Sequence, residues 1–165
     1  MLFRRAKILD LPDIMRIIDD AVSRMLSEGK CQWNDNYPRD EHIIADIDSG
    51  VGYVLEENGK VIAYGAVVFT GEPAYDHPEG DWLTDEEYVV VHRLAVDMQA
   101  QSRGVGRLFL ASVEKLASQK GIGSFRIDTN FDNNRMLALL DRCGFEFTGL
   151  VHYPTGERRA FEKLI

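Results

Sequence analysis

The stretch that decides the fold runs Val96-Asp97-Met98-Gln99-Ala100-Gln101-Ser102-Arg103-Gly104-Val105-Gly106-Arg107-Leu108. It follows an apolar, β-branched run typical of a buried strand and leads into an amphipathic run typical of a helix. Gly104 and Gly106 let backbone N–H groups approach a ligand closely, because glycine has no Cβ. The start of a helix adds unsatisfied N–H donors and the positive end of the helix dipole. The stretch therefore predicts a phosphate or pyrophosphate site, to which Arg103 and Arg107 add charge.

Two common nucleotide-binding patterns do not fit this stretch. A P-loop needs Gly-Lys followed by Ser or Thr, but Gly106 is followed by Arg107 and Leu108. A dinucleotide-binding fingerprint needs a small residue three positions after its second glycine, where this chain has Phe109. Both nucleotide-binding classes are therefore excluded.

Outward from this stretch, the pattern predicts alternating strands and helices. Asn58-Gly59 between two apolar runs predicts a hairpin, and the polar segment 71–87 predicts a long loop. We expect one helix that starts at Asp10-Leu11-Pro12-Asp13, with Asp10 as its cap, and ends at Gly29. We expect further helices over 39–47, 108–120 and 133–143. We expect strands over 2–8, 53–55, 61–68, 88–96, 124–129, 145–153 and 159–164. This order indicates an α/β fold with a mixed sheet and helices on both sides, and no repeat or linker divides the single predicted domain, 1–165.

Composition and charge restrict the class of partner. The chain of 165 residues is 45% hydrophobic and 28% charged, with a net charge of -8, so we expect a globular protein that binds neither nucleic acid nor a membrane. No segment predicts a signal peptide or a bilayer span. Cys31 and Cys143 form neither a disulfide framework nor a metal-ligand spacing, so we expect small buried residues, no metal and a cytoplasmic location.

The loop Gln101-Ser102-Arg103-Gly104-Val105-Gly106 resembles the acyl-coenzyme A loop of the GNAT superfamily of N-acetyltransferases, whose pattern is Gln/Arg-x-x-Gly-x-Gly/Ala. Its position between a strand and a helix also matches that family. A second similar segment follows, with Asn133, Met136 and Leu139 spaced three apart and then Gly144-Phe145. The order of elements matches the family over essentially the whole chain.

The resemblance implies a GNAT-like acyl-CoA N-acyltransferase fold, with a mixed, mostly antiparallel sheet splayed at its centre and helices on both faces. It implies that acetyl-CoA is the co-substrate and that a small-molecule primary amine attacks it directly in a ternary complex. The alternative is a catalytically silent acyl-CoA-binding sensor or interaction module on the same fold. The implied coenzyme-binding residues are Leu94, Ala95 and Val96 for the pantetheine arm, Gln101, Ser102, Arg103, Gly104, Val105, Gly106 and Arg107 for the pyrophosphate, and Asn133 for the arm. A role for Asn133 as a helix cap remains an equal alternative.

The chain departs from the family at the residue that usually protonates the leaving thiolate. Many members carry a tyrosine there, and this chain has Leu140. Tyr153 and Cys143 are the candidate substitute acids. For the base that deprotonates the amine we favour His92, because strand alternation puts it on the same side as Leu94. A structural histidine, or Glu86 and Glu87 as the base, remain alternatives.

The regions that form the acceptor site in the family are rich in aromatic and acidic residues. We select Trp33, Trp82 and Glu86 as substrate-binding candidates, because aromatic faces and carboxylates attract a cationic amine. Aromatic residues that simply close the edge of the core are the alternative. A sheet edge near the C-terminus is open to pairing with a second copy and so allows a homodimer.

Overall fold

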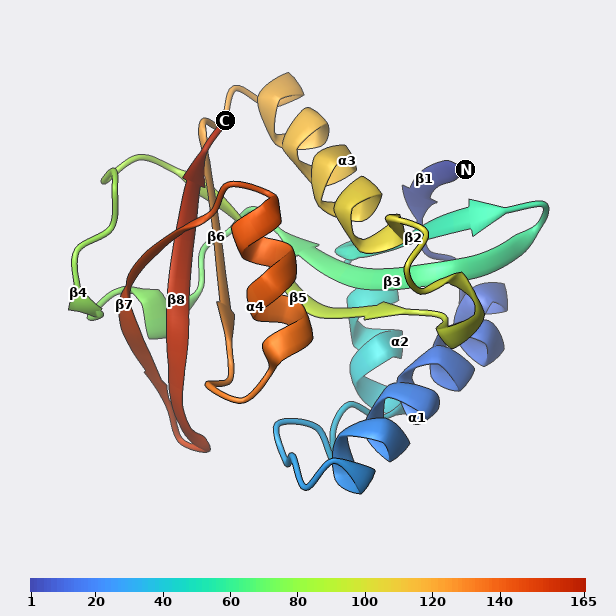
Figure 1. The fold of residues 1–165 in the computed structure, drawn as a ribbon. Coiled ribbons are helices and arrows are strands. Elements are labelled where there is room, and N and C mark those ends of the chain that lie inside the picture. The colour runs from blue at the N-terminus through green and yellow to red at the C-terminus, as the bar shows by residue number, and fades with distance from the viewer. The chain divides into compact units, whose positions relative to one another are not determined.

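The computed structural model describes residues 1–165, which divide into two compact units. The first unit contains residues 1–67 and 92–109, and the second contains 68–91 and 110–165. Strand β5 (Tyr88–Val96) and helix α3 (Val105–Gln119) contribute to both (Figure 1). The chain has an eight-stranded, mixed and mostly antiparallel sheet with helices, which confirms the predicted fold class.

The strands of the first unit lie in the order β1 (Leu2–Arg5), β2 (Gly52–Glu57), β3 (Lys60–Val68) and β5. β1 pairs with β2, and β2 with β3, in antiparallel register. The turn between β2 and β3 has φ +52 at Asn58 and +79 at Gly59, the left-handed angles that this residue pair tolerates in a tight turn. The predicted hairpin is therefore confirmed.

Helices α1 (Leu11–Ser27) and α2 (Asp40–Asp48) lie side by side in the first unit (Figure 1). They share a core with one face of the strands, built from Ile14, Ile17, Ile18, Val22, Trp33, Ile43, Val54, Val61, Tyr64 and Ala95 among others. On β2, Tyr53 points to the face opposite Val54, where it stacks on Phe3 at 5.1 Å. Phe109 of α3 packs edge-on against Phe3 at 5.3 Å. Both faces of these strands are therefore covered by helices, as predicted.

In the second unit the order is β5, β6 (Ser124–Thr129), β8 (Gly156–Leu164), β7 (Glu146–Tyr153) and β4 (Glu79–Gly80), with helix α4 (Asn134–Arg142) before β7. β5 and β6 are parallel, and their pairing covers only Tyr88–Val90 against Ser124–Arg126. The other strand pairs of this unit are antiparallel. Short 3-10 turns lie at Ile8–Asp10 (η1), Pro73–Tyr75 (η2) and Met98–Ala100 (η3).

Segment 71–87 is more ordered than the predicted loop, because it contains η2 and β4. Glycine permits the pairing of β4 with β7. A Cβ at Gly80 would lie 2.2 Å from the carbonyl oxygen of Thr148, and a Cβ at Gly149 would lie 2.0 Å from that of Glu79. The short strand β4 covers β7 only at Gly149 and Leu150, so a homodimer through the remaining edge stays a prediction.

Three local predictions differ from the structure. Helix α3 begins at Val105 rather than Leu108, because Gly106 is tolerated in its first turn. The Asp10 carboxylate binds Arg4 and accepts from Lys7 N at 2.7 Å instead of capping α1. Cys31 is exposed and Cys143 is half-buried, so neither is the fully buried residue that its small size suggested.

A buried ion pair joins the strands of the second unit to the segment before β5. Glu162 is 0% exposed and Arg126 is 5% exposed. One oxygen of Glu162 accepts from Ser124 Oγ and from Arg126 Nε, and the other accepts from the backbone N–H of Leu83. Arg126 also donates to the carbonyl oxygen of Thr84. This pair therefore fixes residues 82–84 against β6 and β8.

We expect Glu162→Gln to lower the free energy of unfolding by about 3 kcal/mol, because it leaves a buried guanidinium without its counter-charge. Chemical denaturation at pH 7 measures the change. The control is Glu114→Gln, which removes the part-exposed partner of Lys163 and should have an effect below about 1 kcal/mol. Equal effects of the two substitutions would contradict a special role for the buried pair.

Candidate functional site

The predicted coenzyme loop forms the entrance to α3. After η3, Ser102 has φ +63 and Gly104 has φ +76. The first hydrogen bond of the helix runs from Leu108 N to Gly104 O at 2.9 Å. The N–H groups of Gly104, Val105, Gly106 and Arg107 precede this bond and have no partner within the helix. They form the positive end of the α3 dipole.

The space beside these N–H groups suits an anionic ligand. Gly104 is exposed, and a Cβ built on it meets no atom within 4 Å. Val105 is 2% exposed and so anchors the helix start in the core. Arg107 is exposed, and Arg103 binds the Glu57 carboxylate at 2.8 and 2.9 Å. The residues present therefore fit the pyrophosphate of a coenzyme, with Arg107 the more available of the two predicted cations.

Asp97 holds the turn that leads from β5 into this loop. It is 1% exposed, and its carboxylate accepts from Gln99 N at 2.9 Å and forms ion pairs with Arg16 at 3.0 Å and Lys60 at 3.2 Å. Burial by itself raises the pKa of Asp97, but the hydrogen bonds from Gln99, Arg16 and Lys60 outweigh it and leave the pKa below its ordinary value. The ionised form of Asp97 therefore stabilises the turn.

Asp97→Asn should lower the free energy of unfolding by about 2 kcal/mol at pH 7, because charge-assisted hydrogen bonds are lost. The lowered pKa of Asp97 determines how its contribution to the free energy of unfolding depends on pH. This contribution is present above the ordinary aspartate pKa of 3.8 and is lost as the pH falls through the lowered pKa. Denaturation curves at pH 7, 5 and 3 should thus show wild type and variant converging with acidity. A difference that stays constant over this range would exclude ionised Asp97 as its source.

β5 carries the predicted pantetheine residues and the predicted base. Leu94 and Val96 are half-buried, and Ala95 is 5% exposed. His92, also half-buried, lies on the same strand. Arg93 between them has φ +56, which interrupts the regular alternation of side chains. The shared side that we predicted for His92 and Leu94 rested on regular alternation and stays a prediction.

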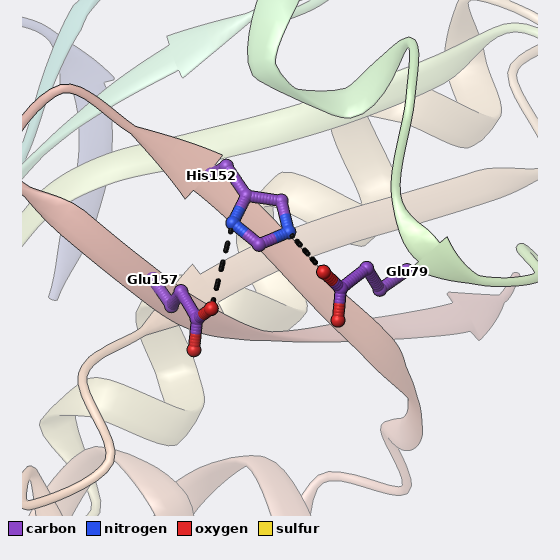
Figure 2. A group of neighbouring side chains, drawn as sticks. All are labelled: Glu79, His152 and Glu157. Atoms are coloured by element: carbon purple, nitrogen blue, oxygen red, sulfur yellow. Dashed lines mark ion pairs between the residues drawn. The ribbon is translucent and has the colours of Figure 1, made fainter.

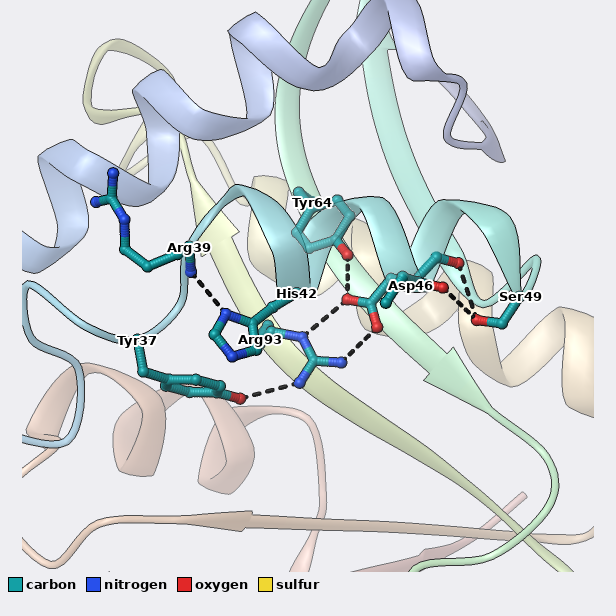
Figure 3. A network of polar contacts seen from close by, with 8 residues as sticks. Tyr37, Arg39, His42, Asp46, Ser49, Tyr64 and Arg93 are labelled. Carbon is teal, nitrogen blue, oxygen red and sulfur yellow. Dashed lines mark hydrogen bonds and ion pairs between the residues drawn. The ribbon is translucent and has the colours of Figure 1, made fainter.

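An ion pair holds Arg93 in this unusual conformation (Figure 3). Its guanidinium donates to both oxygens of Asp46 on α2, at 2.6 and 2.8 Å. Tyr64 donates to the same carboxylate at 2.5 Å, and Arg93 Nη1 donates to the hydroxyl of Tyr37 at 2.9 Å. Burial and the charge of Asp46 raise the pKa of Tyr64 well above its ordinary value, so Tyr64 remains a neutral donor. The network ties β5 to α2 and to the segment before it.

In the second unit, two tyrosines converge on Asp128 of β6. Tyr75 donates to Asp128 Oδ2 at 2.7 Å, and Tyr153 donates to the same oxygen at 2.8 Å. Burial, and then the charge of Asp128, raise the pKa of both tyrosines well above the ordinary value. That direction makes Tyr153 a weaker proton donor to a thiolate, and its role as the acid stays a prediction.

The three predicted substrate-binding residues lie in different surroundings. Trp33 is 7% exposed and packs in the core of the first unit. Trp82 donates its indole N–H to Tyr75 O at 3.0 Å, and its ring lies 4.3 Å from the Arg126 guanidinium. Glu86 is exposed, and its backbone N–H donates to Thr84 at 3.2 Å. The structure therefore gives Trp33 and Trp82 internal packing partners, and substrate binding by the three stays a prediction.

Asn133 precedes α4, and Leu140 lies within this helix. The Asn133 side chain accepts from Met136 N at 3.3 Å and donates to Thr129 Oγ1 at 3.1 Å. The predicted helix cap is therefore present, and a contact of Asn133 with the coenzyme arm stays a prediction. Leu140, which the resemblance predicts to stand in place of a tyrosine, is 0% exposed.

One group of side chains has the residue types of a metal site: Glu79, His152 and Glu157 (Figure 2). All three are exposed. His152 Nε2 lies 3.0 Å from Glu79, and its Nδ1 lies 3.8 Å from Glu157. Because each ring nitrogen faces a different carboxylate, the arrangement is that of two surface ion pairs around one imidazole.

Sequence reasoning missed Asp128, Asp46 and Arg93. Asp128 carried a signal, because it is an acidic residue within the predicted strand Ser124–Thr129. Its two tyrosine partners lie 53 and 25 residues away in the chain, so no local pattern could identify them. Arg93 and Asp46 are likewise 47 residues apart.

Comparisons with known proteins agree with this architecture. The model of the acetyltransferase (GNAT) family matches residues 17–145. A GNAT-family acetyltransferase of Streptococcus agalactiae is 33% identical, with 99% of this chain and 95% of that one covered and a TM-score of 0.90. A comparison with curated protein sequences finds no match.

Two more distant solved structures share the fold. The ribosomal-protein-alanine N-acetyltransferase of Brucella melitensis is 22% identical over 100% of both chains, with a TM-score of 0.71. The Salmonella typhimurium protein yncA, solved with its cofactor acetyl-CoA, is 20% identical over 99% of this chain and 93% of its own, with a TM-score of 0.70. No helix of the present chain has both the length and the apolar character needed to cross a membrane.

Proposed function

Because the chain belongs to the GNAT family of acetyltransferases, we propose that it transfers the acetyl group of acetyl-CoA to a primary amine of a small molecule. The observation that carries the coenzyme assignment is the entrance of α3, where four backbone N–H groups precede the first helical bond and Gly104 faces open space. Two cysteines without a disulfide are compatible with a cytoplasmic location.

Residues of β5 and of the loop before α3 would hold the coenzyme. Backbone N–H groups of the loop Gln101 to Gly106 would bind the pyrophosphate, above all those of Gly104 to Gly106, which precede the first helical bond, with Arg107 adding charge. Backbone groups of Leu94, Ala95 and Val96 would bind the pantetheine arm, and Asn133 is a further candidate contact. When bound, acetyl-CoA supplies an activated acetyl group as a thioester.

The proposed transfer is direct. The amine nitrogen forms a bond to the acetyl carbon as the carbon–sulfur bond breaks, and the amine proton leaves to a base. A lysine-like amine has a pKa near 10.4, so removing its proton at pH 7 requires about 4–5 kcal/mol. Protonating a thiolate of pKa near 8.5 supplies only about 2 kcal/mol. The base therefore matters more than the acid, and the chain can act without the tyrosine that Leu140 replaces.

Gly104→Asp should abolish acetyl-CoA binding, because it puts a carboxylate beside the phosphate site. Gly121→Asp is a matched control, since Gly121 also has φ +76 and also has nothing within 4 Å of a built Cβ. Calorimetric titration should show the wild type and the Gly121 variant binding at micromolar strength and the Gly104 variant not binding. Equal binding of acetyl-CoA by all three proteins would contradict the assignment of the coenzyme site to this loop.

His92→Ala should lower kcat for amine acetylation by about 100-fold while the Kd for acetyl-CoA stays within twofold, because only proton removal is lost. The comparison is His77→Ala, which changes an exposed histidine of segment 71–87. Thiol release from an amine panel measures turnover. Undiminished turnover in the His92 variant would refute its role as the base.

A further inference from the structure

The Asp128 carboxylate is held in an unusual way. Both tyrosine hydroxyls donate to Oδ2, at 2.7 and 2.8 Å, and no group of the chain donates to Oδ1. Tyr75 is 2% exposed, and its ring lies 5.0 Å from Trp82 and 6.0 Å from Tyr88. Asp128 is therefore fixed by a rigid aromatic support, with one oxygen left for another donor.

The charge of Asp128 has no cationic partner in the chain. The three fully buried carboxylates each have one: Asp46 binds Arg93, Asp97 binds Arg16 and Lys60, and Glu162 binds Arg126. Half-buried Asp128 is bound only by two neutral phenols. A carboxylate that is partly withdrawn from water and oriented in this way is complementary to a cation.

A second acidic side chain adds to the negative potential at this place. The charge of Glu72 raises the pKa of Tyr75 and of Tyr153, after the larger effects of burial and of Asp128. The charge of Arg158 lowers the pKa of Tyr153 by a smaller effect. The Trp82 and Tyr88 rings already have a cation against them, because the Arg126 guanidinium lies 4.3 Å from the Trp82 ring and 4.0 Å from the Tyr88 ring. Asp128 is thus a carboxylate that an external ammonium can bind through Oδ1.

We propose that Asp128 binds a cationic group of the acceptor other than the amine that is acetylated, so that the preferred acceptors carry at least two positive charges. This inference rests on the proposed amine acetyltransferase function and names its substrate class. An ion pair with the reacting nitrogen would stabilise its ammonium form and oppose the proton loss that attack requires. A second ammonium is stabilised by Asp128 without that penalty.

The test compares two amines of equal chain length, 1,4-diaminobutane and butylamine, in calorimetric titrations of the coenzyme A-saturated protein. The wild type should bind the diamine about 10- to 100-fold more tightly, the range expected for one charge-assisted hydrogen bond. Asp128→Asn should remove this preference and leave butylamine affinity within twofold. Asparagine keeps the shape of the side chain and can still accept from both tyrosines.

Asp132→Asn is the charge-matched control, because Asp132 is exposed and its carboxylate accepts from the side chain of Asn130. It should retain the full preference. Tyr153→Phe should weaken the preference by a smaller factor, since the carboxylate keeps its charge and loses one support. Equal affinity of the wild type for both amines, a preference that survives in Asp128→Asn, or an equal loss for both amines would each overturn the inference.

Thiol release with the same two amines separates this inference from the proposed function. Acetyl transfer without a preference for the diamine would support the proposed acetyltransferase function and overturn the inference about Asp128. Diamine preference that depends on Asp128, but without transfer to any amine, would support the inference and refute the proposed function.

Discussion

The pairing of each fully buried carboxylate with a cation is the constraint on which both units depend. In the second unit Glu162, with no exposed surface, binds Arg126, Ser124 and the backbone of Leu83. A charge withdrawn from water to this extent is tolerated only where partners surround it. The positions of β6, β8 and the segment before β5 are therefore set together. In the first unit Asp46 and Arg93 do the same for α2 and β5.

Two charged residues of β6, Arg126 and Asp128, differ in whether they have an ionic partner within the chain. Arg126 is engaged by Glu162 and lies against the rings of Trp82 and Tyr88, so the aromatic residues of segment 71–87 serve the interior of the unit. Asp128 lies two residues after Arg126 on the same strand and lacks such a partner. The same strand therefore carries one charge that completes the core and one whose partners are two tyrosine hydroxyls.

Features that depend on neighbouring residues could be predicted from the sequence. The hairpin at Asn58-Gly59 follows from the angles that these two residues tolerate, and a loop that leads into a helix follows from Gly104 and Gly106 at the start of an amphipathic run. The two-residue strand β4 could not be predicted, because it exists only where Gly80 meets Gly149. The roles of Trp33 and Asp128 were equally inaccessible, since each depends on partners distant in the chain. Local backbone structure could thus be predicted from the sequence, and pairing between distant residues could not.

The left-handed backbone at Arg93 couples its identity to that of Asp46. A glycine would adopt φ +56 without strain but would have no guanidinium to bind Asp46. An arginine at this angle is retained because the ion pair compensates the backbone conformation. Among related chains the two positions should therefore change together, with glycine or asparagine at the first wherever the second is no longer acidic. Co-variation of these two sites, 47 residues apart, would mark the members that share this form of β5.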